Sequence, residues 1–195
     1  MIFNKGEKNM SIEAGDFRTG LTLLIDGNIY QVLDFMHVKP GKGAAILKTK
    51  LRNLRTGSIL ERNFNTTTKF EQAIIEKKEV QFSYVDGDTY NFMDSETYEM
   101  YEIDKSVIGF AKNFLVEGNT VIIKFFESEV LGLDLPSTVT LTVTETTGAV
   151  AGNTASTATK DAKVETGLVV KVPLFIKEGD KIIIFTDDGK YNGRA

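Results

Sequence analysis

Short runs of apolar residues separated by glycine-containing turns recur along this chain. The runs Leu21–Ile25 and Ile29–Leu33 flank Asp26-Gly27, and further Asp-Gly pairs stand at positions 86–87 and 188–189. Asp-Gly favours the positive φ angles that a two-residue hairpin turn requires. The pattern therefore predicts antiparallel hairpins and an all-β fold.

The predicted strands group into three units. After the first hairpin we expect strands at Ala44–Leu51, Ser58–Asn65, Val80–Tyr84, Thr89–Met93, Thr120–Phe126, Val130–Leu135, Thr138–Thr144, Gly167–Val172, Lys181–Thr186 and Lys190–Asn192. A short helix is predicted at Ser106–Val116, and a mobile loop at Thr146–Lys163, where small and polar residues predominate. Each unit, of roughly 60 residues, is near the lower size limit of a self-stabilising domain.

The expected domains are small β-barrels at 10–73, 74–137 and 138–195. Residues 1–9 are interpreted as an N-terminal extension, either disordered or read from an upstream start codon, because the segment after Met10 reads as a domain start.

Composition excludes several classes of protein. The chain has no cysteine and a single histidine, His37, which removes disulfide scaffolds, thiol nucleophiles and the usual zinc ligand sets. The first nine residues lack the apolar stretch of a secretory signal. No apolar run approaches the roughly 18 residues that span a bilayer. We therefore expect a cytoplasmic protein with no metal and no membrane partner.

The charge is unevenly distributed. The chain carries a net charge of −4, yet residues 1–72 hold 11 basic and 7 acidic residues, and the remainder holds 12 and 20. From Phe35 to Leu60 there is no acidic residue, whereas six basic residues fall in that window. Such a stripe suits a phosphate backbone, although a solvated face of an ordinary domain is the competing interpretation.

The segment from Lys39 to Ala45 is predicted to be a hairpin tip. Gly41 and Gly43 place no side chain beside Lys42, and Pro40 stiffens the approach, so Lys42 should project alone. An ordinary turn is the alternative. A nucleotide-binding P-loop is excluded, because Met36 stands where its first glycine is needed and no Ser or Thr follows the lysine.

Several motifs resemble one family in their order and spacing. They are Ile12–Leu21, His37–Ala45, Thr49–Gly57 and a C-terminal set formed by Lys160, Ala162, Gly167, Val172-Pro173 and Gly179. Together they make the chain similar to the lysine-type, bacterial elongation factor P family from Met10 to Ala195. The chain departs from the family pattern at Asp161, Lys163 and Thr146-Thr147, in or beside the predicted loop.

The resemblance implies an SH3-like, KOW-like N-terminal barrel followed by two OB-fold barrels, arranged in an L shape like a tRNA. It implies a monomeric translation elongation factor that binds both ribosomal subunits beside peptidyl-tRNA. There the factor stimulates peptide-bond formation and relieves stalling at consecutive prolines. It also implies that a lysine-modifying enzyme extends the Lys42 side chain by a group whose type the sequence does not specify, with no other cofactor.

The resemblance and the basic stripe together imply a set of site residues that we expect to contact RNA around the Lys42 tip. They are Lys39, Pro40, Gly41, Gly43, Lys48, Lys50, Arg52 and Arg55, with Tyr191 and Arg194 facing tRNA and the small subunit. For Tyr191 and Arg194 the competing interpretation is an ordinary strand tyrosine and tail arginine.

No catalytic constellation emerges from the sequence. The acidic pairs Asp86 with Asp88 and Asp187 with Asp188 stand in glycine-containing turns, where aspartate serves local hydrogen bonding. His37 is interpreted as structural, with an RNA contact as the alternative. Two other functions stay open: an elongation-factor-P-like paralogue with a different client, and a general OB-fold RNA-binding protein, which would need aromatic residues on a basic face.

Overall fold

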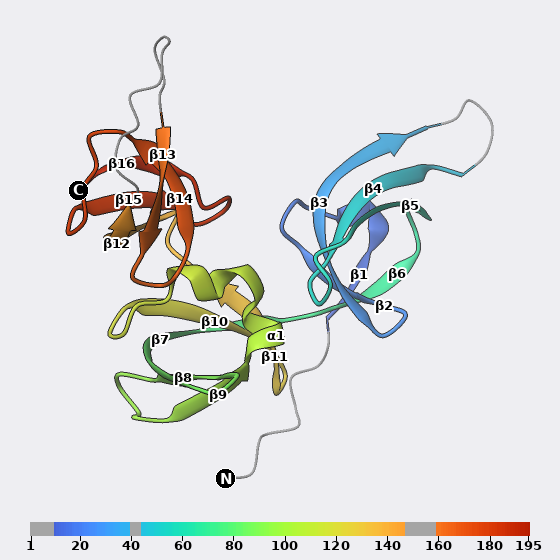
Figure 1. Ribbon diagram of the computed structural model, residues 1–195. Helices are drawn as coiled ribbons and strands as arrows, with labels where there is room; N and C mark the ends of the chain where they lie inside the picture. The colour runs from blue at the N-terminus through green and yellow to red at the C-terminus, as the bar shows by residue number, and fades with distance from the viewer. Residues whose placement is uncertain (1–9, 40–43, 147–158) are drawn as a thin grey trace. The chain divides into compact units, whose positions relative to one another are not determined.

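The computed structural model describes residues 10–39, 44–146 and 159–195. It is built almost entirely of β-strands, as predicted (Figure 1). The chain divides into two compact units, one formed by Met1–Glu76 with Phe125–Leu131 and the other by Lys77–Lys124 with Gly132–Ala195. The L-shaped arrangement stays a prediction. Among the described residues, no helix is long and apolar enough to cross a membrane.

The first sheet has six strands in the order β1-β6-β2-β3-β4-β5. Their bounds are β1 Ser11–Glu13, β2 Thr22–Ile25, β3 Asn28–Val38, β4 Ile46–Asn53, β5 Ile59–Asn65 and β6 Lys69–Gln72, with a 3-10 helix, η1, at Ala14–Asp16. All pairs are antiparallel. The predicted first hairpin is confirmed, since Ile25 pairs with Asn28 and Asp26 and Gly27 adopt φ angles of 52° and 75°.

The interior of this sheet follows from strand alternation. Along β4 every second residue is buried, so Leu47 and Leu51 join Leu23 and Val32 in the core. Three phenylalanines close the core, with ring centroids 4.7 to 6.1 Å apart: Phe17, Phe64 and Phe70. A rigid scaffold therefore carries β3 and β4.

The second sheet has five strands in the order β11-β10-β7-β8-β9. Its elements are β7 Ile75–Asp86, β8 Thr89–Met93, β9 Met100–Asp104, α1 Lys105–Ile108, η2 Gly109–Phe114, β10 Thr120–Phe126 and β11 Glu129–Asp134. The prediction missed β9. The predicted helix is present with different bounds and type, because one α-helical turn gives way at Gly109 to a 3-10 helix that ends at Phe114. Asp86 pairs with Thr89, so the turn residues are Gly87 and Asp88.

The third sheet has the order β14-β13-β12-β15-β16. Its strands are β12 Thr138–Thr146, β13 Thr159–Val164, β14 Val169–Pro173, β15 Lys181–Phe185 and β16 Tyr191–Arg194. Residues 159–163 of the predicted mobile loop are therefore strand; residues 147–158 lie outside the described part. Phe114 of η2 is 1% exposed and packs in the apolar core of this sheet. A hydrogen bond of 2.6 Å from the Thr166 hydroxyl to the Asn113 carbonyl adds to that contact.

Candidate nucleic-acid interface

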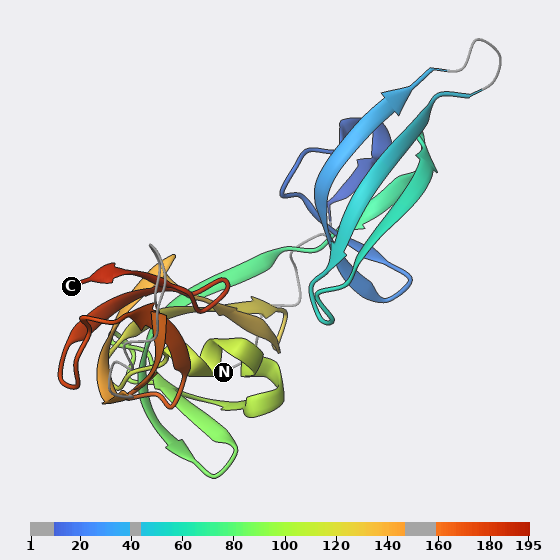
Figure 2. The ribbon, with the colours of Figure 1, turned by 45° about the horizontal axis from the view of Figure 1, so that its top comes forward.

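The long hairpin of β3 and β4 leads to the segment that the sequence singles out. Figure 2 shows the two strands paired side by side, and their register runs from Tyr30 opposite Asn53 to Val38 opposite Ile46. Pro40, Gly41, Lys42 and Gly43, predicted as the tip, lie outside the described residues. Lys39 directly before them is exposed.

The outward side of β3, β4 and β5 forms one continuous surface, which we call the hairpin face. Residues directly opposite each other in an antiparallel sheet point to the same side. By register and exposure, the hairpin face consists of Asp34, Met36 and Val38 on β3, Ile46, Lys48, Lys50 and Arg52 on β4, and Ile59, Glu61, Asn63 and Asn65 on β5. Three of the predicted RNA-binding cations therefore share one surface.

The three cations of the hairpin face have different neighbours. Lys50 lies between Asp34 and Glu61, which are opposite it on β3 and β5. Lys48 lies between Met36 and Asn63, and Arg52 lies opposite Ile59. Within the described part of the chain, none of the three cations forms an ion pair. Lys48 and Arg52 therefore keep their charge free for an anionic partner.

Arg55 has a different environment from these cations. Its guanidinium donates two hydrogen bonds of 2.7 Å to the Glu129 carboxylate, and a third to the Gly27 carbonyl. Residue 129 belongs to the same compact unit. The hydrogen bond to Glu129 raises the pKa of Arg55, and the same bond lowers the pKa of Glu129. Most of the donors of Arg55 are thus occupied within the protein.

The two predicted C-terminal site residues are both on β16. Tyr191 is half-buried and packs against the apolar core of the third sheet. Arg194 is exposed, and its guanidinium lies 3.0 Å from the Asp180 carboxylate. The structure gives both residues a packing or pairing role inside the domain, and their contact with RNA stays a prediction.

His37 points to neither a metal nor a catalytic partner. It is exposed on β3, and its ring packs edge-on against Phe35 with centroids 5.8 Å apart. Among the described residues, no group of three His, Asp or Glu side chains is arranged to hold a metal ion.

The acidic pairs of the turns are engaged locally. Asp88 accepts a 2.8 Å hydrogen bond from Lys105, and Asp188 forms a 2.6 Å ion pair with Lys190. Hydrogen bonds from the side chain and then the backbone of Lys190 lower the pKa of Asp188. Each of these two carboxylates therefore pairs with a lysine, an arrangement that stabilises turns.

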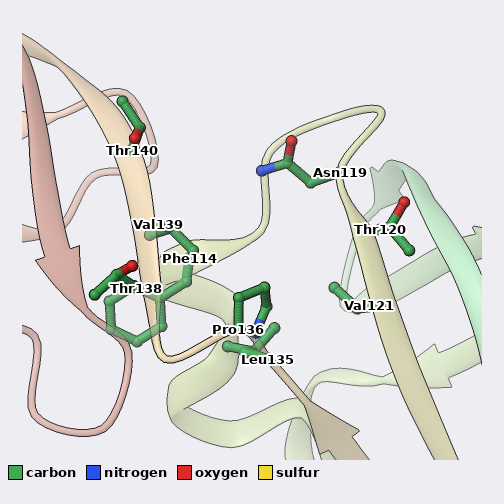
Figure 3. A pocket seen from close by; sticks show the side chains of 9 residues that line it. All are labelled: Phe114, Asn119, Thr120, Val121, Leu135, Pro136, Thr138, Val139 and Thr140. Atoms are coloured by element: carbon green, nitrogen blue, oxygen red, sulfur yellow. The ribbon is translucent and has the colours of Figure 1, made fainter. Parts of the chain in front are cut away.

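A pocket of about 320 Å³ lies among residues of η2, β10 and β12 (Figure 3). Its lining consists of Phe114, Asn119, Thr120, Val121, Leu135, Pro136, Thr138, Val139 and Thr140. None of these side chains carries a charge or titrates near neutral pH. The pocket thus supplies no general acid or base.

The sequence-based prediction missed the apolar members of the hairpin face. Met36 is 65% exposed and Ile59 is 50% exposed, and they flank Lys48 and Arg52 respectively. The period-two alternation of Ile46, Lys48, Lys50 and Arg52 indicates a shared face on β4. Nothing in the sequence marks Met36 as its neighbour.

Comparison with known families covers nearly the whole described chain. Residues 13–70 match the elongation factor P (EF-P) KOW-like domain, residues 75–133 the elongation factor P (EF-P) OB domain, and residues 139–194 the elongation factor P C-terminal domain. The chain belongs to the elongation factor P family. As a member of that family it is a translation factor rather than a classical enzyme. Factors of the elongation factor P family act on the ribosome.

Two solved structures of initiation factor 5A proteins resemble part of this chain. The chain is 26% identical to the eukaryotic translation initiation factor 5A from Methanococcus jannaschii, with a TM-score of 0.52 over 64% of this chain and 90% of that one. A translation initiation factor eif-5a family protein from Naegleria fowleri shares the fold, with 14% identity and a TM-score of 0.50 over 65% of this chain and 96% of that one.

Proposed function

We propose that this factor binds the ribosome beside peptidyl-tRNA and stimulates peptide-bond formation at consecutive prolines, with Lys42 as its working residue. The observation that carries the proposal is the match of three elongation factor P domains in order along the chain. The hairpin face adds a surface for RNA, because it brings Lys48 and Arg52 to the strands that lead to residues 40–43.

Proline explains why such a factor is needed. Proline is a cyclic secondary amine with a fixed φ, so it is a poor acceptor and constrains the chain that receives it. A basic loop resting on the acceptor end of peptidyl-tRNA would hold that end in a reactive pose. Restricting orientation in this way lowers a barrier by up to several kcal/mol without any acid, base or nucleophile from the factor.

The length of a lysine suggests why Lys42 would be extended. A bare lysine side chain reaches only about 6 Å from the backbone. An enzymatically added group would lengthen that reach and add hydrogen-bonding atoms. We therefore include a covalent modification of Lys42 by a dedicated enzyme in the proposal, together with a cytoplasmic location and contacts of Tyr191 and Arg194 with tRNA and the small subunit.

The hairpin face would support the tip through electrostatics. Exposed lysine and arginine side chains release counterions when they neutralise phosphates, so affinity should fall as salt rises. Met36 and Ile59 would pack against ribose or base surfaces between those phosphate contacts. The face thus combines charge with apolar contact area beside the tip segment.

The test is a reconstituted translation reaction on two reporter messages, one with consecutive prolines and one without. Adding the factor purified from its own host should restore full-length product from the proline reporter and leave the other unchanged. An equal effect on both reporters would favour a general RNA-binding protein. Ribosome binding without any rescue would favour the paralogue with another client.

A further inference from the structure

The central part of the chain carries all of the excess negative charge. Residues 73–137 hold 13 acidic and 5 basic residues, whereas residues 138–195 hold 7 of each. The central domain therefore has a net charge of −8. Such a field repels phosphate and attracts cationic partners.

The few basic residues of this domain are mostly paired within it. Lys77 and Lys124 both contact Asp134, Lys105 contacts Asp88, and Lys78 lies 3.7 Å from Glu99. The fifth, Lys112, is exposed on η2. Lysines that are already paired do not offset the negative field elsewhere on the domain.

Where β7, β8 and β9 are paired, between Gln81 and Asp104, one side of the three strands carries no lysine or arginine, whereas Lys77 lies further back on that side of β7. By register, this side carries Gln81, Tyr84, Asp86, Thr89, Asn91, Met93, Met100, Glu102 and Asp104; Asn91 is buried, and the other eight residues are here called the acidic face. Phe82, Phe92 and Ile103 point the other way and are buried in the core. In the sheet order β9 is an edge strand, and Figure 1 shows it at the end of the sheet.

The acidic face combines carboxylates with two exposed apolar side chains, Tyr84 on β7 and Met100 on the edge strand β9. Tyr84 is 54% exposed and Met100 is 44% exposed, while Glu102 and Asp104 follow Met100 on the outward side of β9. Asp104 accepts hydrogen bonds from the Ser106 hydroxyl and amide, which lower its pKa and keep it ionised. Exposed aromatic and methionine side chains rimmed by polar groups are typical of protein-binding surfaces.

The turn beside this surface adds another aromatic side chain. Tyr98 is 73% exposed between β8 and β9. Asp94 holds the turn by accepting hydrogen bonds from the amides of Glu96 and Thr97. Tyr98 is therefore presented from an ordered turn, and tyrosine is among the residues that contribute most to binding energy at protein interfaces.

We propose that the acidic face binds a basic protein of the ribosome. The proposal rests on the proposed function, because the ribosome is where the partner is sought. RNA is disfavoured, since three carboxylates and no cation would meet its phosphates. A protein segment with lysine or arginine side chains near an apolar residue complements both the carboxylates and the exposed Tyr84 and Met100 side chains. The factor would then meet RNA through the hairpin face and protein through the acidic face.

The experiment uses photocrosslinking of the full chain on purified ribosomes. One variant carries p-benzoylphenylalanine in place of Met100, on the acidic face. The matched variant carries it in place of Ile59, on the hairpin face. Both positions are exposed strand residues, and both variants are first tested for co-sedimentation with ribosomes. We expect the probe at position 100 to crosslink to a lysine- and arginine-rich ribosomal protein, and the probe at position 59 to crosslink to RNA.

Charge reversal supplies a second readout. Glu102→Lys should weaken ribosome binding roughly three- to tenfold, because a reversed charge on the acidic face slows association with a basic partner. Glu117→Lys makes the same charge change at an exposed residue outside the acidic face and should have little effect.

The outcomes separate the two proposals. If position 100 crosslinks only to RNA, to a second copy of the factor or to nothing while the chain co-sediments, the acidic-face proposal is wrong and the proposed function stands. A Glu102→Lys variant that binds like wild type also overturns the acidic-face proposal. If the wild-type chain does not bind ribosomes at all, the proposed function fails and this inference fails with it.

Discussion

Lys50 on β4 lies directly opposite Glu61 on β5 and, on its other side, directly opposite Asp34 on β3. Lys48, two residues earlier on the same side of β4, is flanked by Met36 and Asn63 instead. Opposite charges across a strand pair attract each other, so the two carboxylates make the surroundings of Lys50 less positive than those of Lys48. If the hairpin face binds RNA as proposed, the strand register, and not only the number of lysines, determines how much each cation contributes.

This difference predicts unequal effects of two equivalent substitutions. Lys48→Gln should weaken ribosome binding roughly three- to tenfold and reduce the slope of log affinity against log salt by about one. Lys50→Gln should have a smaller effect, because Asp34 and Glu61 opposite Lys50 repel phosphate and weaken its contribution. The measurement is co-sedimentation with ribosomes across a salt series.

Lys69→Gln is the matched control for both substitutions. Lys69 is an exposed lysine on β6 of the same compact unit, outside the hairpin face. The Lys69→Gln variant should bind ribosomes as tightly as the wild-type factor does. Equal losses of ribosome affinity for Lys48→Gln and Lys50→Gln would show that the carboxylates opposite Lys50 have no influence on binding.

A buried hydroxyl predicts a stability gain. Thr49 is 2% exposed, and its Oγ1 has no hydrogen-bond partner among the described residues. Thr49→Val should therefore leave stability unchanged or raise it by up to about 1 kcal/mol, because an unsatisfied polar group costs free energy when buried. Thr49→Ser keeps the hydroxyl, removes a buried methyl and should destabilise. Urea unfolding followed by circular dichroism measures both, and destabilisation by valine would contradict the account.

Gly189 combines two constraints. Its φ is 72°, and a Cβ built on it would lie 3.3 Å from Cζ of Phe110. Gly189→Ala should therefore destabilise the domain by about 1 to 3 kcal/mol. Gly167→Ala is the control, since Gly167 also has a positive φ, 88°, but nothing lies within 4 Å of its Cβ position. If Gly189→Ala and Gly167→Ala lower the melting temperature equally, Phe110 adds no constraint at position 189.

The ion pairs of Asp134 should make a contribution to stability that depends on pH. Burial opposes its ionisation, but hydrogen bonds and charge from Lys124 and then Lys77 outweigh burial and lower its pKa. A lowered folded-state pKa gives stability that is present above the ordinary aspartate value of about 3.9 and is lost as pH falls through the folded-state pKa. Asp134→Asn should thus reduce the melting temperature more at pH 7 than at pH 3. An equal reduction at both pH values would contradict this.

Most of the hairpin strands were predictable from local chemistry, whereas β1, β6, β9 and β13 were not predicted. Asp26-Gly27 forms the expected turn because both residues tolerate positive φ, and Thr120–Phe126 forms β10 because β-branched and aromatic residues favour strands. β9 was missed because Met100–Asp104 is short and carries Glu102 and Asp104 on its outward side. Its single buried apolar residue, Ile103, gives a weak signal.

The surroundings of the basic residues depend on pairing between distant strands, so they could not be predicted from the sequence. The window from Phe35 to Leu60 contains no acid, yet the sheet brings the residues just outside it, Asp34 and Glu61, to either side of Lys50. A bulge between Val32 and Asp34 fixes that register. The partner of Arg55 is 74 positions away in the sequence, so its ion pair with Glu129 could not be anticipated.

The most direct test of the central claim is rescue of a consecutive-proline reporter by Lys42→Ala, compared with wild-type factor purified from its own host. Both proteins are first matched for ribosome co-sedimentation, so that loss of binding is not mistaken for loss of action. The account predicts that Lys42→Ala still binds ribosomes but no longer restores full-length product. Equal rescue by the two proteins would contradict the account and move the function away from Lys42.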